Sequence, residues 1–163
     1  MRTVVLGGPP GVGKSTVGRL TAARRQRCAF IDVDDIRQLV VAGAAAPWDG
    51  PEGQAQQRLG AVNACMLANS FVENTFDVLI VDVLTAETLL VYRTRLDRPL
   101  IVQLTVQYAE ACRRASTRQV YLTPDEFQML HAQQAEFAGD DVTLDITQPT
   151  AHETATRIAD LTR

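Results

Sequence analysis

Five short runs of apolar residues, rich in Val, Ile and Leu, recur along the 163-residue chain. They cover Thr3–Gly7, Cys28–Asp32, Val78–Asp82, Leu100–Thr105 and Val142–Ile146. None of these runs alternates cleanly between apolar and polar positions, as a half-exposed strand would. Continuous apolar runs of this length are typical of parallel strands that are buried on both faces. The pattern therefore predicts five strands of a parallel sheet.

Stretches with helical spacing of apolar residues lie between these runs. The predicted helices cover Lys14–Gln26, Pro51–Asn74, Ala86–Leu96, Ala109–Arg118 and Pro124–Phe137. In the second of them, Leu59, Val62 and Met66 recur at helical spacing. Strands that alternate with helices imply a doubly wound α/β fold, in which ligands bind at the carboxyl ends of the strands. No repeat or linker divides the chain, so we expect one domain over residues 1–163.

Two helix starts carry a capping box, in which Thr at the N-cap is followed by Glu three residues later. Thr123 and Glu126 form the first box, which also has Pro at the first helical position. Thr150 and Glu153 form the second, near the end of the chain. The second box therefore predicts a further helix after the fifth strand.

The first apolar run leads into Gly8-Pro9-Pro10-Gly11-Val12-Gly13-Lys14-Ser15, which matches G-x-x-x-x-G-K-[ST] at every fixed position. Glycines let the backbone wrap closely around an anion, and its amides form a nest at a helix N-terminus. Lys14 would reach the β- and γ-phosphates of ATP, and Ser15 would ligate Mg²⁺. The predicted nucleotide-binding residues here are Gly8, Gly11, Val12, Gly13, Lys14, Ser15 and Thr16.

Lys14 is the single lysine among 16 basic residues. A guanine-recognition motif of the N-K-x-D type would need a second lysine. Because the chain has none, the sequence excludes the common GTPases. The chain is also short for an ATPase with an added helical lid. Among P-loop proteins, its size favours a kinase for small substrates.

The second predicted strand ends in a cluster of carboxylates with one arginine, Asp32-Val33-Asp34-Asp35-Ile36-Arg37. A kinase needs a carboxylate at this edge of the sheet to orient the attacking hydroxyl and accept its proton. An arginine there would fix an anionic group of the substrate. Alternatively, the carboxylates cap a helix that begins near Asp35.

The P-loop followed by D-x-D-D-I-R resembles the small P-loop kinases and phosphotransferases. This group includes shikimate, gluconate and adenylylsulfate kinases, chloramphenicol phosphotransferase and a polynucleotide 5′-kinase. The resemblance implies a P-loop NTPase fold, with helices on both faces of a five-stranded parallel sheet and a short helical lid. It also implies that Asp34 is the catalytic base or hydroxyl ligand, that Asp32 lies near Mg²⁺, and that Arg37 binds on the substrate side.

The third predicted strand continues into Asp82-Val83-Leu84-Thr85, where shikimate kinases have a glycine-rich turn, so shikimate is not the expected acceptor. Four apolar residues before Asp82 give it the Walker B form, in which the carboxylate holds a Mg²⁺ water. Asp82 is therefore predicted either to serve the metal or to face the acceptor. Whether Asp32 or Asp82 serves the metal remains open.

A lid is predicted over residues 108–124. In the resembling kinases, an R-x-x-x-R lid closes over ATP, one arginine stacking on adenine and another stabilising charge on the transferred phosphoryl group. Arg114 and Arg118 have this spacing. The acceptor side is predicted over residues 34–75, where Trp48 lies in a Gly- and Pro-rich loop. Its ring would stack on an acceptor or close the loop onto the domain.

The predicted activity is transfer of the γ-phosphate of ATP, with Mg²⁺, to a hydroxyl of a metabolite or natural product, antibiotics included. The catalytic candidates are Asp34, Lys14, Arg114 and Arg118, and the acceptor-binding candidates are Asp34, Arg37, Trp48 and Asp82. The pattern Asp34–Gln38 is close to that of polynucleotide kinase, so a 5′-hydroxyl oligonucleotide remains an alternative acceptor. A nucleotide-dependent switch or slow ATPase without an acceptor is a third reading.

The overall charge gives no sign of a general nucleic-acid binder, since the net charge is −3 and the isoelectric point is near 5.3. The N-terminal apolar run is too short for a signal peptide, and no segment has the length of a membrane span. We therefore expect a cytoplasmic protein with no membrane partner. The sequence makes no prediction of the oligomeric state.

Overall fold

A computed structural model describes residues 3–117 and 122–162. Its five strands are all parallel, and their order across the sheet is β2-β3-β1-β4-β5. They are β1 (Thr3–Gly7), β2 (Cys28–Asp32), β3 (Asp77–Val81), β4 (Leu100–Thr105) and β5 (Val142–Asp145). The α/β fold predicted from the sequence is confirmed. β3 and β5 each end one residue early, although the amides of Asp82 and Ile146 still donate to the neighbouring strands.

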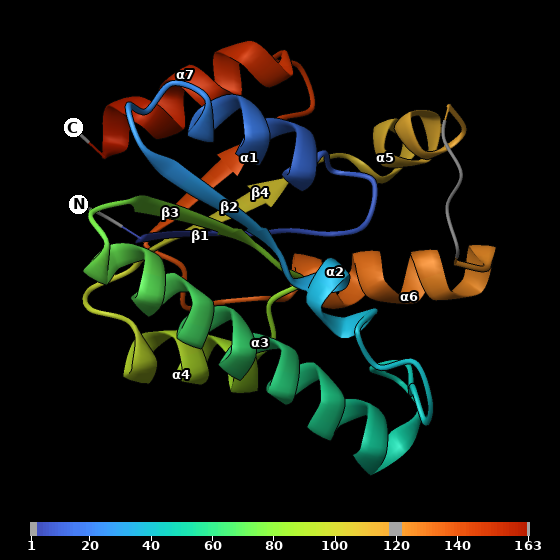
Figure 1. Cartoon of the computed structure of the whole chain (residues 1–163). Coiled ribbons are helices and arrows are strands. Elements are labelled where there is room, and N and C mark those ends of the chain that lie inside the picture. Colours follow the sequence, from blue (N-terminus) through green and yellow to red (C-terminus); the bar gives the residue numbers. More distant parts are fainter. Residues whose placement is uncertain (1–2, 118–121, 163) are drawn as a thin grey trace.

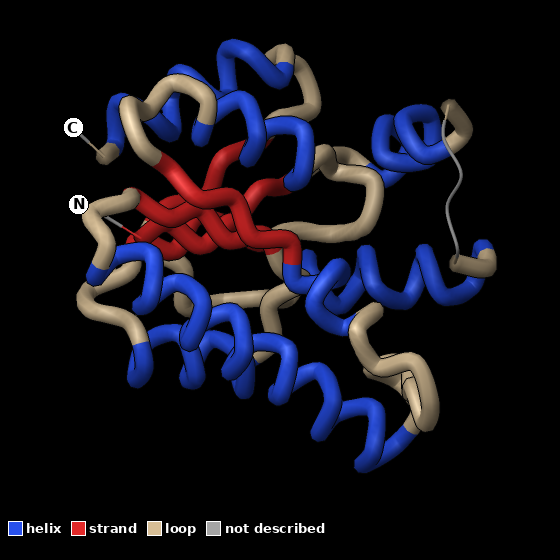
Figure 2. Tube along the Cα trace, in the orientation of Figure 1, coloured by secondary structure: helices blue, strands red, loops and turns tan. Residues whose placement is uncertain are grey.

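Helices cover both faces of this sheet. They are α1 (Lys14–Ala22), α2 (Val33–Arg37), α3 (Gly50–Glu73), α4 (Ala86–Arg95), α5 (Tyr108–Ala115), α6 (Pro124–Ala135) and α7 (Ala151–Leu161). Figure 1 shows α1 and α7 on one face and α3 and α4 on the other. In Figure 2, α2, α5 and α6 gather at the end of the sheet that lies away from both chain termini. Within the described residues, no helix combines the length and apolar character needed to cross a membrane.

The sheet is buried on both faces, as its continuous apolar runs predict. Val4 and Leu6 pack into the core beneath α1 and α7, whereas Val5 between them packs into the core beneath α3 and α4. All three side chains are at most 3% exposed. Alternate residues of one strand therefore enter two separate cores, so every position in the strand needs to be apolar.

The long helix α3 packs through small side chains rather than through the large apolar residues that mark its helical spacing. Leu59 and Met66 are 49% and 64% exposed, and Val62 is only partly buried. The residues that α3 buries are Gly53, Gly60, Ala61, Ala64, Cys65 and Ala68. The helix was predicted from the sequence, but its buried residues were not identified, because close approach of α3 to the sheet and to α2 selects small residues.

Both predicted capping boxes are present, at Thr123 and Thr150. The short helix α2 was not assigned from the sequence, which offered only a helix that begins near Asp35. It begins at Val33, because the Asp32 carboxylate at the N-cap accepts a hydrogen bond from the Asp34 amide at 3.2 Å. Asp34 is thereby placed in the first turn of a helix, directly beyond the carboxyl end of β2.

Candidate active site

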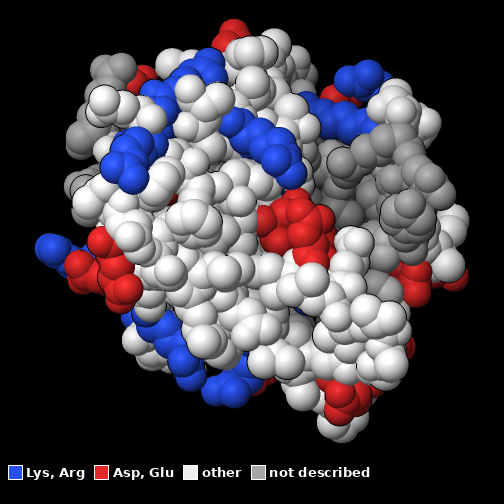
Figure 3. Space-filling view, viewed as in Figure 1, with Lys and Arg blue, Asp and Glu red and all other residues white. Residues whose placement is uncertain are grey.

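A cleft of about 1560 Å³ opens at the carboxyl ends of the strands. The loop after β1, α2, the loop of residues 40–48, the turn from β3 to α4 and one face of α6 line it. Figure 3 shows an acidic patch over α2, whose first turn carries Asp34 and Asp35. The site therefore lies where doubly wound folds bind their ligands.

The loop between β1 and α1 has the geometry of a phosphate-binding loop. Gly11 and Gly13 have φ values of +77° and +107°, which L-residues with side chains rarely adopt. A Cβ atom at Gly11 would lie 3.0 Å from both the Ala111 carbonyl oxygen and the Phe127 ring. Gly13 is also the N-cap of α1, so no side chain covers the first turn of that helix. The loop is thus held against α5 and α6 and leaves the helix N-terminus open to an anion.

The Lys14 side chain folds back over this loop. Its Nζ donates hydrogen bonds to the carbonyl oxygens of Gly8 at 2.8 Å and Pro9 at 3.1 Å. Lys14 and Ser15 both line the cleft, whereas Thr16 is exposed on α1 and is not among the lining residues. The ammonium group therefore lies at the loop that would surround the phosphates.

Ser15 and Asp32 form a polar pair between α1 and β2. The Ser15 hydroxyl donates to Asp32 Oδ2 at 2.8 Å. Burial raises the pKa of Asp32, and the hydrogen bond from Ser15 lowers it part of the way back. A hydroxyl and a carboxylate in contact are hard oxygen ligands that suit Mg²⁺, which keeps several waters and is often held by one or two protein groups together with phosphates. The residues present therefore fit the predicted metal.

Across the described residues there is no group of three or more His, Cys, Asp or Glu side chains that would form an all-protein metal site.

Asp34 and Arg37 lie on one side of α2 and both line the cleft. Arg37 Nη1 lies 3.4 Å from Asp34 Oδ1. The Asp34 side chain is 65% exposed, whereas that of Arg37 is 22% exposed. The stem of Arg37 packs closely on α3, since a Cβ at Gly60 would lie 3.0 Å from Arg37 Cγ. A fixed arginine thus holds an accessible carboxylate.

Asp82 lies at the floor of the cleft, after β3. Its carboxylate accepts hydrogen bonds from the Tyr92 hydroxyl at 2.6 Å and from the Val83 amide at 2.7 Å. Burial raises the pKa of Asp82 to about 7. The sequence did not point to Tyr92, although its position on the inward face of the predicted helix Ala86–Leu96 was a usable signal. Asp82 contacts Tyr92 and Val83, whereas Asp32 contacts Ser15, so the two carboxylates have different surroundings.

The raised pKa of Asp82 predicts a pH-dependent stability. The folded protein binds this proton more tightly than the unfolded chain, where the ordinary value is 3.8. The stabilising contribution is therefore complete below about pH 4 and is lost as the pH rises through about 7. Between pH 5 and pH 8, wild-type protein should lose roughly 2–3 kcal/mol more unfolding free energy than Asp82→Asn. Urea unfolding at both pH values measures this, and equal losses in the two proteins would contradict it.

The loop that carries Trp48 is fastened to the start of α3. Gln56 Oε1 accepts from the Ala45 amide at 3.0 Å, and Gln56 Nε2 donates to the Gly43 carbonyl at 2.8 Å. A Cβ at Gly53 would overlap the Ala46 carbonyl, so only glycine allows this close approach. Trp48 is half-buried and lines the cleft, and its role on the acceptor side stays a prediction.

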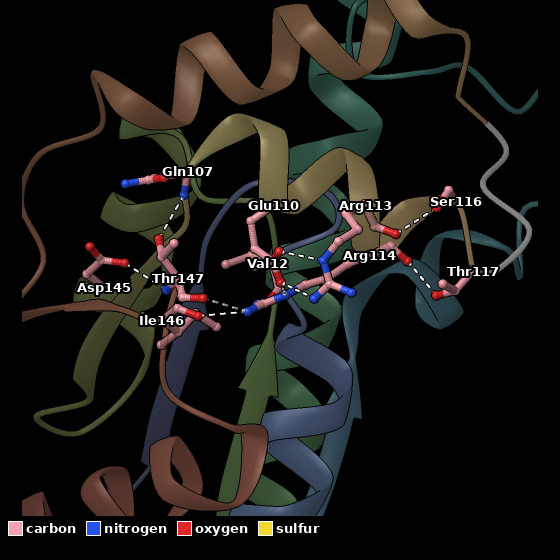
Figure 4. Close-up of polar contacts among 10 residues, drawn as sticks. All are labelled: Val12, Gln107, Glu110, Arg113, Arg114, Ser116, Thr117, Asp145, Ile146 and Thr147. Carbon is pink, nitrogen blue, oxygen red and sulfur yellow. Dashed lines mark hydrogen bonds and ion pairs between the residues drawn. The ribbon is translucent and has the colours of Figure 1, made fainter.

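Arg114 is a residue of α5, and Figure 4 shows its side chain between the P-loop and the loop after β5. Its guanidinium donates to the carbonyl oxygens of Val12 at 3.0 Å and Ile146 at 2.8 Å. Its Nε donates to Glu110 at 2.7 Å. The pair of Glu110 and Arg114 was not identified from the sequence, although their i,i+4 spacing on a helix was a usable signal. Arg114 is not among the cleft-lining residues, and the predicted lid residue Arg118 lies outside the described residues.

A protein-family model described as an AAA domain matches residues 4–124. Three solved structures with similar folds are an unliganded sugar kinase from Janibacter sp. HTCC2649, a shikimate kinase from Acinetobacter baumannii in complex with shikimate, and a tunicamycin resistance protein from Deinococcus radiodurans. Among curated proteins, none matches the sequence significantly.

The sugar kinase has a TM-score of 0.75 at 14% identity, over 98% of this chain and 93% of that chain. The shikimate kinase has a TM-score of 0.66 at 23% identity, over 99% of this chain and 93% of that chain. The tunicamycin resistance protein has a TM-score of 0.72 at 13% identity, over 99% of this chain and 95% of that chain. At these identities the likeness shows the fold, which is that of the small P-loop kinases, as the resemblance in sequence predicted.

Proposed function

The chain belongs to the AAA-domain family, and from this premise we propose that it is an ATP-dependent kinase that transfers the γ-phosphate to a hydroxyl group of a small molecule. One observation carries the proposal: a single cleft is lined by the phosphate-binding loop with Lys14, by the Ser15–Asp32 pair and by the accessible carboxylate of Asp34. A protein that only binds a nucleotide does not need a carboxylate and a fixed arginine beside the phosphates of that nucleotide.

The loop amides and Lys14 would bind the β- and γ-phosphates of ATP and compensate their charge. Mg²⁺ held by Ser15, with Asp32 holding its waters, would neutralise further charge on the transferred group. Of the two carboxylates that the sequence left as alternatives, we assign Asp32 to the metal because it is the one in contact with Ser15. Asp82 is assigned to the acceptor side.

Asp34 would orient the acceptor hydroxyl and accept its proton. As the hydroxyl oxygen bonds to the γ-phosphorus, the bond from that phosphorus to the β–γ bridging oxygen breaks and ADP leaves. Arg114 would hold the lid to the nucleotide side of the site through the Val12 and Ile146 carbonyls. Charge stabilisation by Arg118 remains a prediction.

The assignment of the metal carboxylate can be tested by substitution. Asp32→Asn should raise the Mg²⁺ concentration needed for half-maximal turnover about 10–100-fold, because a group that orients metal-bound water is lost. Asp82→Asn should leave the Mg²⁺ dependence unchanged, since the Asp82 carboxylate already accepts hydrogen bonds from the Tyr92 hydroxyl and the Val83 amide. Titration of ATP turnover with Mg²⁺ measures both. The assignment fails if the two variants behave in the reverse way.

The activity itself is tested with γ-labelled ATP, Mg²⁺ and a pool of metabolites, hydroxylated natural products and 5′-hydroxyl oligonucleotides. Label in a new organic species, absent with Lys14→Met protein, would support the kinase. Label that appears only in inorganic phosphate, or that stays in ATP, would overturn the proposal and favour a switch or a slow ATPase. Label on the oligonucleotides alone would replace the small-molecule acceptor by a nucleic acid.

A further inference from the structure

The acceptor side of the cleft, meaning the lining residues of α2 and of the ranges 40–57, 82–87 and 130–138, is poor in positive charge. Among the described residues that line it, Arg37 is the one basic side chain. Four carboxylates line the same part: Asp34, Asp82, Glu87 and Glu136. Glu87 is paired with Arg58, whose Nε lies 3.2 Å from Glu87 Oε1. Even with Asp82 protonated and Glu87 balanced by Arg58, Asp34 and Glu136 outnumber the one basic side chain of this lining.

The charge of Arg37 is already matched within the protein. Its guanidinium lies 3.4 Å from the Asp34 carboxylate. Burial raises the pKa of Asp82, and the positive charge of Arg37 offsets a small part of that rise, so Arg37 acts on both carboxylates. An acceptor carboxylate or phosphate that took Arg37 as its partner would break the contact with Asp34 and would lie beside two acidic groups. Like charges at such short range repel, and the closed cleft screens them less than water would.

The other lining groups suit an acceptor without negative charge. Gln54, Gln57 and Gln133 bring amide groups, which donate and accept hydrogen bonds and therefore match hydroxyls. Val40, Pro47, Trp48, Leu130 and Phe137 bring apolar surface. Apolar walls with a few polar groups are typical of pockets for small organic ligands that carry a ring or chain.

From this distribution we propose that the acceptor is a hydroxylated compound with no net negative charge, either uncharged or amine-bearing, and with an apolar ring or chain. This inference rests on the proposed kinase function. It excludes carboxylated sugars and oligonucleotides as natural acceptors. It also changes the expected role of Arg37, which becomes a positioning residue for Asp34 and not the ligand of an anionic acceptor group.

The test separates the acceptor pool by charge. A mixture of hydroxylated metabolites, natural products and 5′-hydroxyl oligonucleotides is passed over anion and cation exchangers at pH 8, and transfer from γ-labelled ATP is measured with each fraction. Label transfer to compounds of the uncharged or cationic fraction is expected. Transfer confined to the anionic fraction would overturn the inference while leaving the kinase intact. No transfer to any fraction would overturn the proposed function, and the inference with it.

A second measurement uses the acceptor found in this way and the variant Arg37→Gln. If Arg37 positions Asp34, kcat should fall at least about 10-fold while the acceptor KM changes less than about 2-fold. If Arg37 binds an acceptor anion, KM should instead rise about 10-fold or more with kcat preserved, and the inference is wrong. Arg157→Gln, an exposed arginine on α7, is the matched control and should match wild type. The melting temperature of each variant confirms that the fold is kept.

Discussion

Asn in place of Asp34 is expected to lower kcat by about 10²–10⁴-fold, because the amide cannot accept the proton of the attacking hydroxyl. Affinity for Mg²⁺-bound ATP should change little, since Asp34 lies on α2 and is not part of the phosphate-binding loop. The side chain is 65% exposed, so the substitution should not disturb the core. A fall in kcat with ATP binding preserved is the signature of a group that acts on the acceptor.

The measurement is steady-state kinetics with the acceptor found by label transfer, together with ATP binding by calorimetry. Asp35→Asn is the matched control, because Asp35 is the neighbouring residue on α2, is exposed and does not line the cleft. Wild-type turnover in Asp34→Asn would show that Asp34 is not the base. An equal loss in Asp35→Asn would point to a general effect of charge on α2.

Lys14→Met is expected to reduce turnover by at least about 10²–10³-fold, the usual cost of removing one group that stabilises developing charge. ATP binding should weaken as well, because the ammonium group lies at the loop that surrounds the phosphates. Lys14→Arg should restore little activity. The planar guanidinium is larger than the ammonium group and does not fit the compact position between the Gly8 and Pro9 carbonyls.

Turnover and ATP affinity of both Lys14 variants are compared with those of Arg19→Met, which removes an exposed positive charge from the same helix. The control should retain wild-type values. If Lys14→Met turned over ATP and acceptor at a rate near that of wild type, the loop would not be the phosphate site.

The elements that the sequence predicted well are those dictated by local chemistry. The strands follow from apolar runs that must fill two cores at once, as Val4 and Val5 do on opposite faces of β1. The phosphate-binding loop could be predicted because Gly11 and Gly13 have positive φ values, which residues with side chains rarely adopt. The capping boxes at Thr123 and Thr150 follow from hydrogen bonds that span only three residues.

The features that could not be predicted depend on contacts between distant segments. Tyr92 meets Asp82 only because the chain folds back after β3, which brings together two residues ten positions apart. Arg114 donates hydrogen bonds to the carbonyl oxygens of Val12 and Ile146, which are far away in the chain. These acceptors are backbone groups, so no residue type in the sequence identifies them. The small residues that α3 buries were not identified, because helical spacing of large apolar residues does not show how closely a helix approaches its neighbours.

The central claim is that the chain forms a phosphate ester on an alcohol. The most direct test is ³¹P nuclear magnetic resonance of the product formed from ATP, Mg²⁺ and the acceptor identified by label transfer. A new phosphomonoester signal coupled to a proton on the esterified carbon is predicted, and it should appear together with an equal amount of ADP. Inorganic phosphate as the sole new signal beside ADP would contradict the claim.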